Sequence, residues 1–173
     1  MTSSSLAIVW HSRTGAAQAI AEAAAQGAST SACAGNDSDG QDRVCLVSAS
    51  DATPEILLAA SGYLFVCPEN LGTMSGIMKD MFDRAYYPLF GQVEGRPYAT
   101  IIAAGSDGRG AEAQIDRIVT GWRLRRVADP MVICLNAQSA QAILAPKTVP
   151  AAVLDRCREL GETMMSGIAL GVF

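Results

Sequence analysis

The feature of the sequence that most constrains the fold is residues 6–27, where an apolar run passes through a short turn into an alanine-rich segment. The run, residues 6–10, lacks polar alternation, which is typical of a parallel strand buried on both faces. Alanine is the strongest helix former, and its small side chain lets a helix lie close to a sheet. The turn, His11-Ser12-Arg13-Thr14-Gly15, carries hydroxyl groups and a glycine. Because free backbone N–H groups and the positive end of the helix dipole meet at such a turn, we predict an anion site there.

Further apolar runs have the character of buried strands: residues 44–47, 63–67, 100–104 and 131–135. Segments between and after them are predicted to be helices. One begins at Thr53-Pro54, and the others carry apolar faces formed by Ile77, Met78, Met81, Phe82 and Ala85, by Ala111, Ile115, Ile118, Val119 and Trp122, and by Val153, Leu154, Cys157, Leu160, Met164 and Ile168. Alternating strands and helices are typical of a doubly wound α/β fold. We therefore predict a single domain over residues 1–173, a five-stranded parallel sheet in the order 2-1-3-4-5 within a three-layer α/β/α arrangement.

Three segments without periodicity are predicted to be irregular: residues 28–42, 68–72 and 136–150. The helix that starts after the second of these is expected to end at Tyr86-Tyr87-Pro88, because proline interrupts helices. Ser106 and Asp107 are candidate caps for the helix that follows the fourth strand, since both residue types accept hydrogen bonds from helix N-termini.

Composition excludes several classes of protein. The net charge of -4 argues against a nucleic-acid partner. No apolar run approaches the ~20 residues of a membrane span, and residues 1–10 lack the features of a signal peptide. The five cysteines are odd in number and lack C-x-x-C spacing, so we expect neither a disulfide framework nor a metal site. Together these features predict a cytoplasmic protein without a nucleic-acid or membrane partner.

Loops that contain glycine and hydrogen-bonding groups follow the first, third and fourth predicted strands. They are residues 12–15, 68–72 and 105–110. In an open α/β sheet, ligands bind outside the carboxyl ends of the strands, where the strand order reverses. Because strands one, three and four are neighbours in the predicted order, one elongated ligand can contact all three loops.

Other ligand-binding and catalytic motifs fit less well. Residues 12–15 lack the three glycines of the dinucleotide fingerprint and the Gly-Lys-Ser/Thr of a P-loop. A response regulator needs acidic residues after strand one and an aspartate at the end of strand three, where this sequence has His11-Ser12 and Cys67-Pro68. No G-x-S-x-G elbow occurs, so hydrolase chemistry lacks its nucleophile.

The turn after the first strand, Ser12-Arg13-Thr14-Gly15-Ala16-Ala17, resembles the FMN phosphate motif of flavodoxin-like proteins, Ser/Thr-x-Thr-Gly-x-Thr. Within that superfamily, His11-Ser12, residues 68–76 and Lys79 are most similar to the NAD(P)H:quinone oxidoreductases of the tryptophan-repressor-binding-protein type and the related FMN reductases. The Gly105-Ser106-Asp107-Gly108 loop is similar to their third flavin loop. The resemblance covers nearly the whole chain and implies a flavodoxin-like fold.

The resemblance also implies an FMN site and an activity. The phosphate would be bound by Ser12, Arg13, Thr14, Gly15, Ala16 and Ala17, and the flavin ring by Pro68, Glu69, Asn70, Leu71, Gly72 and Thr73 on one side and Gly105, Ser106, Asp107 and Gly108 on the other. The implied activity passes electrons from NADPH or NADH through FMN to a quinone or another small acceptor. Some such proteins assemble, so a homodimer or homotetramer is an expectation.

Two residues depart from the pattern of the family. Ala17 stands where relatives have a hydroxyl or amide side chain, so one donor to the phosphate is missing; Arg13 either compensates or is a solvated surface charge. Leu71 stands where many relatives have an aromatic residue, which removes a stacking surface. Two alternatives to the enzyme therefore stay open: a flavodoxin-type electron carrier, and a flavodoxin-fold protein with weak or no FMN binding that serves in binding or regulation.

Several other residues have two interpretations. His11 is the only histidine, and without a catalytic partner in view we expect it to be structural. Arg123, Arg125 and Arg126 either meet a pyridine-nucleotide phosphate or form a solvated basic helix end. The apolar tail, residues 168–173, either forms a subunit interface or folds back onto the sheet.

Overall fold

A parallel sheet runs through the centre of the computed structural model, which describes residues 4–32 and 43–173. Its strands are β1 (Ser5–Trp10), β2 (Arg43–Ser48), β3 (Gly62–Asn70) and β5 (Pro97–Ala104), together with the shorter β6 (Arg125–Arg126) and β7 (Met131–Cys134). The order is β2-β1-β3-β5, and β6 and β7 both pair with the outer side of β5. This confirms the predicted order, with β5 and β7 as its fourth and fifth strands.

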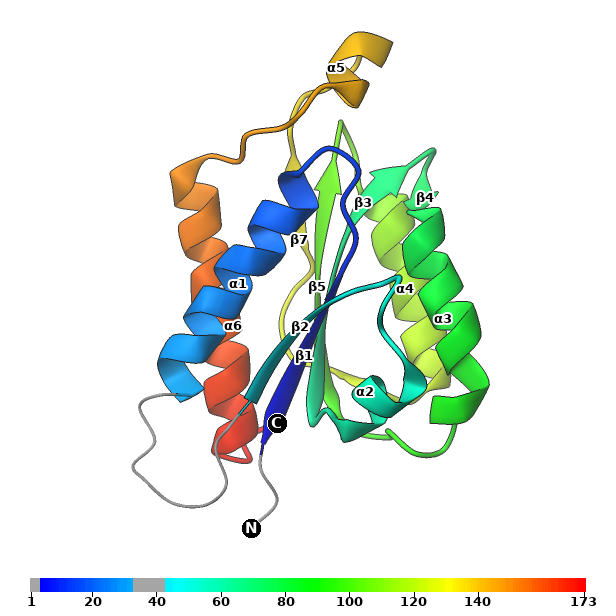
Figure 1. The fold of residues 1–173 in the computed structure, drawn as a ribbon, viewed down its shortest axis with the longest axis vertical. Helices are drawn as coiled ribbons and strands as arrows, with labels where there is room; N and C mark the ends of the chain where they lie inside the picture. Colours follow the sequence, from blue (N-terminus) through cyan, green and yellow to red (C-terminus); the bar gives the residue numbers. More distant parts are fainter. Residues whose placement is uncertain (1–3, 33–42) are drawn as a thin grey trace.

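Helices cover both faces of the sheet (Figure 1). On one side lie α1 (Ala16–Ala32) and α6 (Ala151–Ala169), and on the other lie α2 (Pro54–Ala59), α3 (Gly76–Leu89) and α4 (Arg109–Gly121). A short helix, α5 (Ala140–Leu144), projects beyond the carboxyl end of the sheet. The three-layer α/β/α arrangement is therefore confirmed. No helix in residues 4–32 and 43–173 is long and apolar enough to cross a membrane.

The strands are apolar throughout because each face of the sheet belongs to a separate core. Successive β3 side chains alternate between them: Tyr63 and Phe65 pack with α3 and α4, and Leu64 and Val66 pack with α1 and α6. On the α3 side the core is aromatic, with the Phe82 ring centroid 5.1 Å from that of Phe65 and 5.5 Å from that of Trp122. Burial on both faces explains the absence of polar alternation in the sequence.

Helix α1 is longer than the sequence indicated. Residues 28–32, predicted to be irregular, continue the helix, whereas residues 33–42 lie outside the described part of the chain. Ala28 is fully buried, and the hydroxyls of Ser29 and Thr30 donate to the carbonyls of Ala25 and Gln26, at 2.8 and 3.1 Å. Hydroxyl side chains that bond to carbonyls four residues earlier are compatible with a helix, so the serine and threonine do not end it.

The end of α3 also differs from the prediction. The helix continues through Tyr86 and Pro88 to Leu89, whose side chain is fully buried, and Ile77 is 42% exposed rather than buried. Pro88 lies in the last turn, and the burial of Leu89 stabilises that turn. The predicted irregular segment at residues 136–150 contains α5, whose N-cap is Ser139: its Oγ accepts a hydrogen bond from the Ala142 N–H at 3.1 Å.

Small residues allow α1 and α6 to pack at very short range. A Cβ added to Gly161 would lie 2.0 Å from the Ala24 carbonyl oxygen, and one added to Gly27 would lie 2.0 Å from the Arg158 carbonyl oxygen. These backbone contacts leave no room for a methyl group at Gly27 on α1 or at Gly161 on α6. The alanine-rich sequence of α1 thus serves close packing as well as helix formation.

This contact generates a prediction in which the usual effect of a substitution is reversed. Glycine to alanine in a helix normally stabilises it, by about 1 kcal/mol. We expect Gly161→Ala instead to lower the free energy of unfolding by about 1–3 kcal/mol, because the new methyl overlaps the backbone of α1. Urea denaturation followed by circular dichroism measures the change.

The matched control is Gly76→Ala at the first position of α3, where an added Cβ has no neighbour within 4 Å. This variant should be neutral or stabilising. Equal stability of the two variants would contradict the close approach of α1 and α6.

Candidate functional site

A cavity of about 340 Å³ opens at the carboxyl ends of the strands. Most of the sequence-predicted site residues line it: Ser12, Arg13, Thr14, Ala16, Ala17, Pro68, Glu69, Asn70, Leu71, Gly72, Gly105 and Ser106. The predicted residues Gly15, Thr73, Asp107 and Gly108 are adjacent in sequence but do not line it. The structure adds six lining residues that sequence reasoning missed: Ala103, Ala104, Leu135, Ala137, Ile143 and Lys147. The three predicted loops therefore meet around one cavity.

The turn between β1 and α1 exposes backbone donors. The Ser12 Oγ accepts a hydrogen bond from the Gly15 N–H at 3.0 Å, and Gly15 has φ +92°, a conformation that favours glycine. The next backbone amides, of Ala16, Ala17 and Gln18, have no hydrogen-bond partner in the described residues. These N–H groups lie at the positive end of a helix of 17 residues. The turn therefore has the donors and the field to bind an anion.

The second loop is a β-hairpin rather than an irregular segment. Strand β3 continues through Pro68 to Asn70 and pairs with the antiparallel β4 (Thr73–Met74). Proline is tolerated there because pairing with β1 ends at Val66, so β3 has no parallel neighbour on that side. The hairpin turns at Leu71 and Gly72, with φ +54° and +76°. The Leu71 side chain is fully exposed at the cavity edge.

The α4 N-terminus is capped by a residue from the hairpin. Glu69 accepts hydrogen bonds from the Gly108 N–H at 2.9 Å and the Ala111 N–H at 3.1 Å, one on each carboxylate oxygen. The prediction that Ser106 or Asp107 caps this helix is wrong: Gly108 occupies the N-cap position without a side-chain cap, and Asp107 pairs with Arg109 at 2.7 Å instead. A carboxylate of the protein thus lies at the positive end of α4 and binds two of its amides, whereas no carboxylate of the described residues accepts a hydrogen bond from the first amides of α1.

Two further contacts fix the hairpin against α4. The Gln114 Oε1 accepts a hydrogen bond from the Met74 N–H at 3.0 Å. A Cβ added to Gly110 would lie 2.0 Å from the Gly72 carbonyl oxygen, so only glycine allows this approach. The second and third loops therefore form one connected unit.

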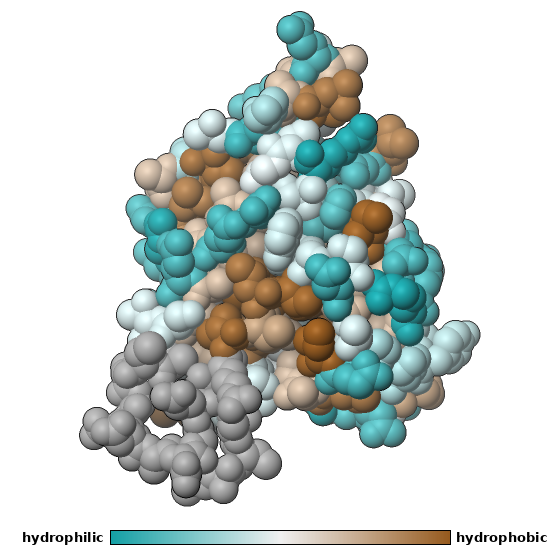
Figure 2. Space-filling view, in the orientation of Figure 1, coloured by the Kyte–Doolittle hydropathy of each residue, from teal (hydrophilic) through white to brown (hydrophobic). Residues whose placement is uncertain are grey.

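The remaining wall of the cavity is residues 135–150, which we call the strap. The strap is attached to the end of β5 by a hydrogen bond from the Leu135 N–H to the Ala104 carbonyl at 2.9 Å, and to the third loop by one from the Ala137 N–H to the Gly105 carbonyl at 3.1 Å. At its other end the Lys147 N–H donates to the Thr14 carbonyl at 2.8 Å. Helix α5 lies between these attachments, and Figure 2 shows hydrophobic atoms on it, where Ile143 and Leu144 are exposed.

The single histidine has a structural environment outside the cavity lining. The His11 Nδ1 lies 2.9 Å from the Oγ of Ser75, which is fully buried, and burial lowers the pKa of His11 below its usual value.

Arg126 pairs with Glu112 and Asp116 and donates to the Thr100 Oγ1, and it stacks over the Tyr98 ring at 4.8 Å. Arg123 pairs with Glu94 at 3.2 Å. Within residues 4–32 and 43–173, no three His, Cys, Asp or Glu side chains are grouped closely enough to bind a metal.

Comparisons with known proteins give a family match and several structural relatives. The family model for NADPH-dependent FMN reductase matches residues 11–131. A protein named flavodoxin from Aquifex aeolicus (strain VF5) is 26% identical over 170 residues, which cover 95% of this chain and 87% of that protein. Among solved structures, a flavodoxin from the domain Archaea has a TM-score of 0.75 at 16% identity, over 95% of this chain and 99% of that one. A flavodoxin, WrbA-like protein from Agrobacterium tumefaciens has a TM-score of 0.67 at 17% identity, over 97% and 99%. The structural matches confirm the flavodoxin-like fold.

The contacts of Glu69 generate a stability prediction. Glu69→Gln should lower the free energy of unfolding by about 1–2 kcal/mol, because an amide offers one acceptor where the carboxylate offers two and carries no charge toward the helix end. Urea denaturation measures the loss. The same chemical change at Glu162, which is exposed on α6, provides the control and should have little effect. If both variants match the unmodified protein, Glu69 does not stabilise the junction of the two loops.

Proposed function

This chain belongs to the NADPH-dependent FMN reductase family, and we propose that it is an FMN-dependent oxidoreductase. In this proposal it takes electrons from NADPH or NADH and passes them to a quinone or another small acceptor. The observation that carries the proposal is the set of unpartnered amides at the start of α1, which adjoin a cavity bordered by the loops after β1, β3 and β5. A mononucleotide needs such a combination of an anion site and a neighbouring apolar surface.

The residues at the first loop fit the phosphate of FMN. We assign it to the amides of Ala16, Ala17 and Gln18 and to the Thr14 hydroxyl, with the Ser12 hydroxyl maintaining the turn through its hydrogen bond with Gly15. Gly15 supplies the left-handed backbone conformation that the turn requires rather than a surface of the cavity.

The second and third loops fit a flat heterocycle. Backbone groups of residues 69–72 border one side of the cavity, and Gly105 and Ser106 border another. The floor is formed by Ala103 and Ala104 at the end of β5, whose small side chains leave space for a planar ring. Thr73, Asp107 and Gly108 act from outside the cavity, by supporting the hairpin and the third loop.

In this proposal the residues of the chain orient the flavin and its substrates, and they carry out no acid–base chemistry. When bound, the flavin supplies the chemistry of hydride acceptance and electron transfer. The charged residues that line the cavity are Arg13, Glu69 and Lys147, and the Glu69 carboxylate is engaged by two backbone N–H groups. No side chain is assigned a proton-transfer step. The exposed Leu71 and Ile143 give the rim an apolar character that suits a flat, uncharged acceptor.

An electron-carrier function is the second candidate, and the 26% identity to the Aquifex flavodoxin favours it. A protein of this kind would bind FMN in the same way but receive electrons from a partner reductase. The third candidate, a flavodoxin-fold protein with weak or no FMN binding, is favoured by Ala17, which lines the cavity without a hydroxyl group.

Titration of the apoprotein with FMN tests the proposal. We expect flavin fluorescence to be quenched with saturation at one FMN per chain, since the cavity has one phosphate site. Stopped-flow mixing with NADPH and with NADH should then bleach the visible flavin band directly.

The other outcomes separate the candidates. Bleaching that requires an added reductase supports the electron carrier and contradicts the enzyme. A protein that leaves FMN fluorescence unchanged at micromolar concentrations contradicts both and supports the third candidate.

A further inference from the structure

A half-buried cation lines the cavity beside the predicted phosphate site. This cationic residue is Lys147, which comes from the strap and has no counterpart in the motif of residues 12–17. The other cation of the cavity, Arg13, is exposed. Among the described residues, Glu69 is the only acidic residue that lines the cavity, and its carboxylate is bound to the α4 N-terminus.

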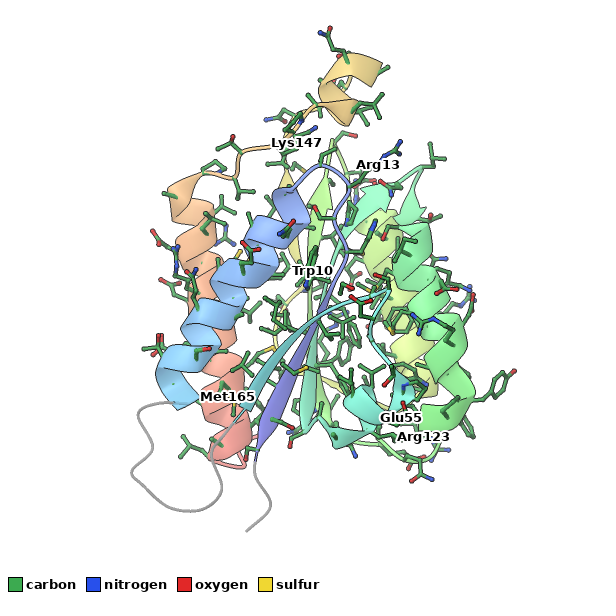
Figure 3. The ribbon with its side chains drawn as sticks, viewed as in Figure 1. Trp10, Arg13, Glu55, Arg123, Lys147 and Met165 are labelled. Atoms are coloured by element: carbon green, nitrogen blue, oxygen red, sulfur yellow. The ribbon has the colours of Figure 1, made fainter. Side chains whose placement is uncertain are left out.

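The backbone of Lys147 is attached to the phosphate turn itself. Its N–H donates to the Thr14 carbonyl at 2.8 Å, and its carbonyl oxygen lies 3.9 Å from the position of a Cβ added to Gly15. Figure 3 shows Lys147 and Arg13 at the same end of the molecule, next to the turn between β1 and α1. The lysine is therefore placed by the fold at the anion site, although it follows Thr14 by more than a hundred residues.

The ammonium group lacks an anionic partner. The Lys147 Nζ donates to the carbonyls of Ala142, Ile143 and Ala145, at 2.6, 3.1 and 2.5 Å. No carboxylate of the described residues lies within ion-pair distance of it. Carbonyl dipoles solvate the charge but do not neutralise it, so an anion can still pair with this ammonium group.

The neighbouring charge is also positive. Lys147 adjoins the N-terminal end of α1, where the helix dipole and the free amides of Ala16 and Ala17 carry partial positive charge. An anion held by these amides would lie in the cavity that Lys147 also lines. The two features together favour a ligand that carries more than one negative charge.

We propose that Lys147 is a phosphate-binding residue, whose ammonium group exchanges one of its α5 carbonyl partners for an oxygen of the FMN phosphate. The inference rests on the proposed function and deepens it. The charge of Lys147, supplied by the strap, replaces the donor that is missing at Ala17. Because the same side chain bonds to the end of α5, phosphate binding also fixes the strap over the cavity.

The competing explanation is that Lys147 only stabilises the C-terminal end of α5. The two explanations predict different effects of a Lys147 substitution on the affinities for FMN and riboflavin. Loss of α5 disturbs any flavin that the strap covers, whereas loss of a phosphate contact disturbs FMN and spares riboflavin, which has the same ring and ribityl chain but no phosphate.

The experiment measures dissociation constants for FMN and riboflavin in the full chain by fluorescence quenching. Lys147→Met removes the charge and Lys147→Arg retains it. Lys79→Met is the matched control, because Lys79 is the only other lysine in the sequence, lies on α3 and pairs with Asp83. We expect Lys147→Met to weaken FMN binding by about tenfold or more, since charge-assisted hydrogen bonds to phosphate are strong. Riboflavin affinity should change little, Lys147→Arg should retain most of the FMN affinity, and Lys79→Met should match the unmodified protein.

Three results overturn the inference while the proposed function stands. The first is a parallel loss of FMN and riboflavin affinity in Lys147→Met, which assigns the lysine to α5 alone. The second is unchanged FMN affinity, and the third is a phosphate-specific loss in Arg13→Met but not in Lys147→Met. If the unmodified protein binds neither FMN nor riboflavin, the proposed function fails and the inference fails with it.

Discussion

The parallel pairing of β3 with β1 on one side and β5 on the other is the constraint on which the site depends. Because all three strands run in the same direction, their carboxyl ends lie at one edge of the sheet, and the loops that follow them surround one cavity. The pairing in turn depends on burial of β3 against α1 and α6 on one face and α3 and α4 on the other. The apolar sequence of these strands therefore determines where the polar loops meet.

The loops are held together by contacts of polar backbone groups with one another and with the Glu69 side chain. Glu69 accepts hydrogen bonds from the amides at the start of α4, and Gly110 allows the carbonyl of Gly72 to approach. The strap connects the third loop to the first, because the Ala137 N–H bonds to the Gly105 carbonyl and the Lys147 N–H bonds to the Thr14 carbonyl. The two helix ends therefore differ: the Glu69 carboxylate binds the Gly108 and Ala111 amides at α4, whereas the Ala16, Ala17 and Gln18 amides at α1 have no partner among the described residues.

The features that were predictable from sequence are those with a local signal. Residues 6–10 and 63–67 are apolar without alternation because both of their faces are buried. The hydroxyl and glycine residues of the turn at residues 12–15 indicate a helix N-terminus. The cap of α4 has no such signal, because Glu69 bonds to residues 39 and 42 positions further along the chain. Lys147 was missed for the same reason: it lies in an aperiodic segment, and only the tertiary contact with Thr14 brings it to the cavity.

Wrong predictions of element boundaries also have physical causes. Residues 68–70, predicted to be irregular, continue β3, because the missing N–H of Pro68 costs little where β3 has no β1 neighbour. Helix α1 continues past Gly27 because that glycine is a contact point with α6 rather than a terminator. In both cases the tertiary environment removes the usual reason for the residue to interrupt an element.

Backbone amide NMR during titration with FMN tests the central claim most directly, because it reports on the donors themselves. The account predicts that the amide signals of Ala16, Ala17 and Gln18 shift most, together with those of the hairpin and of Gly105 and Ser106. Riboflavin should move the hairpin signals but leave those of the first turn of α1 nearly unchanged. A titration in which FMN binds while the signals of Ala16, Ala17 and Gln18 stay in place would contradict the account.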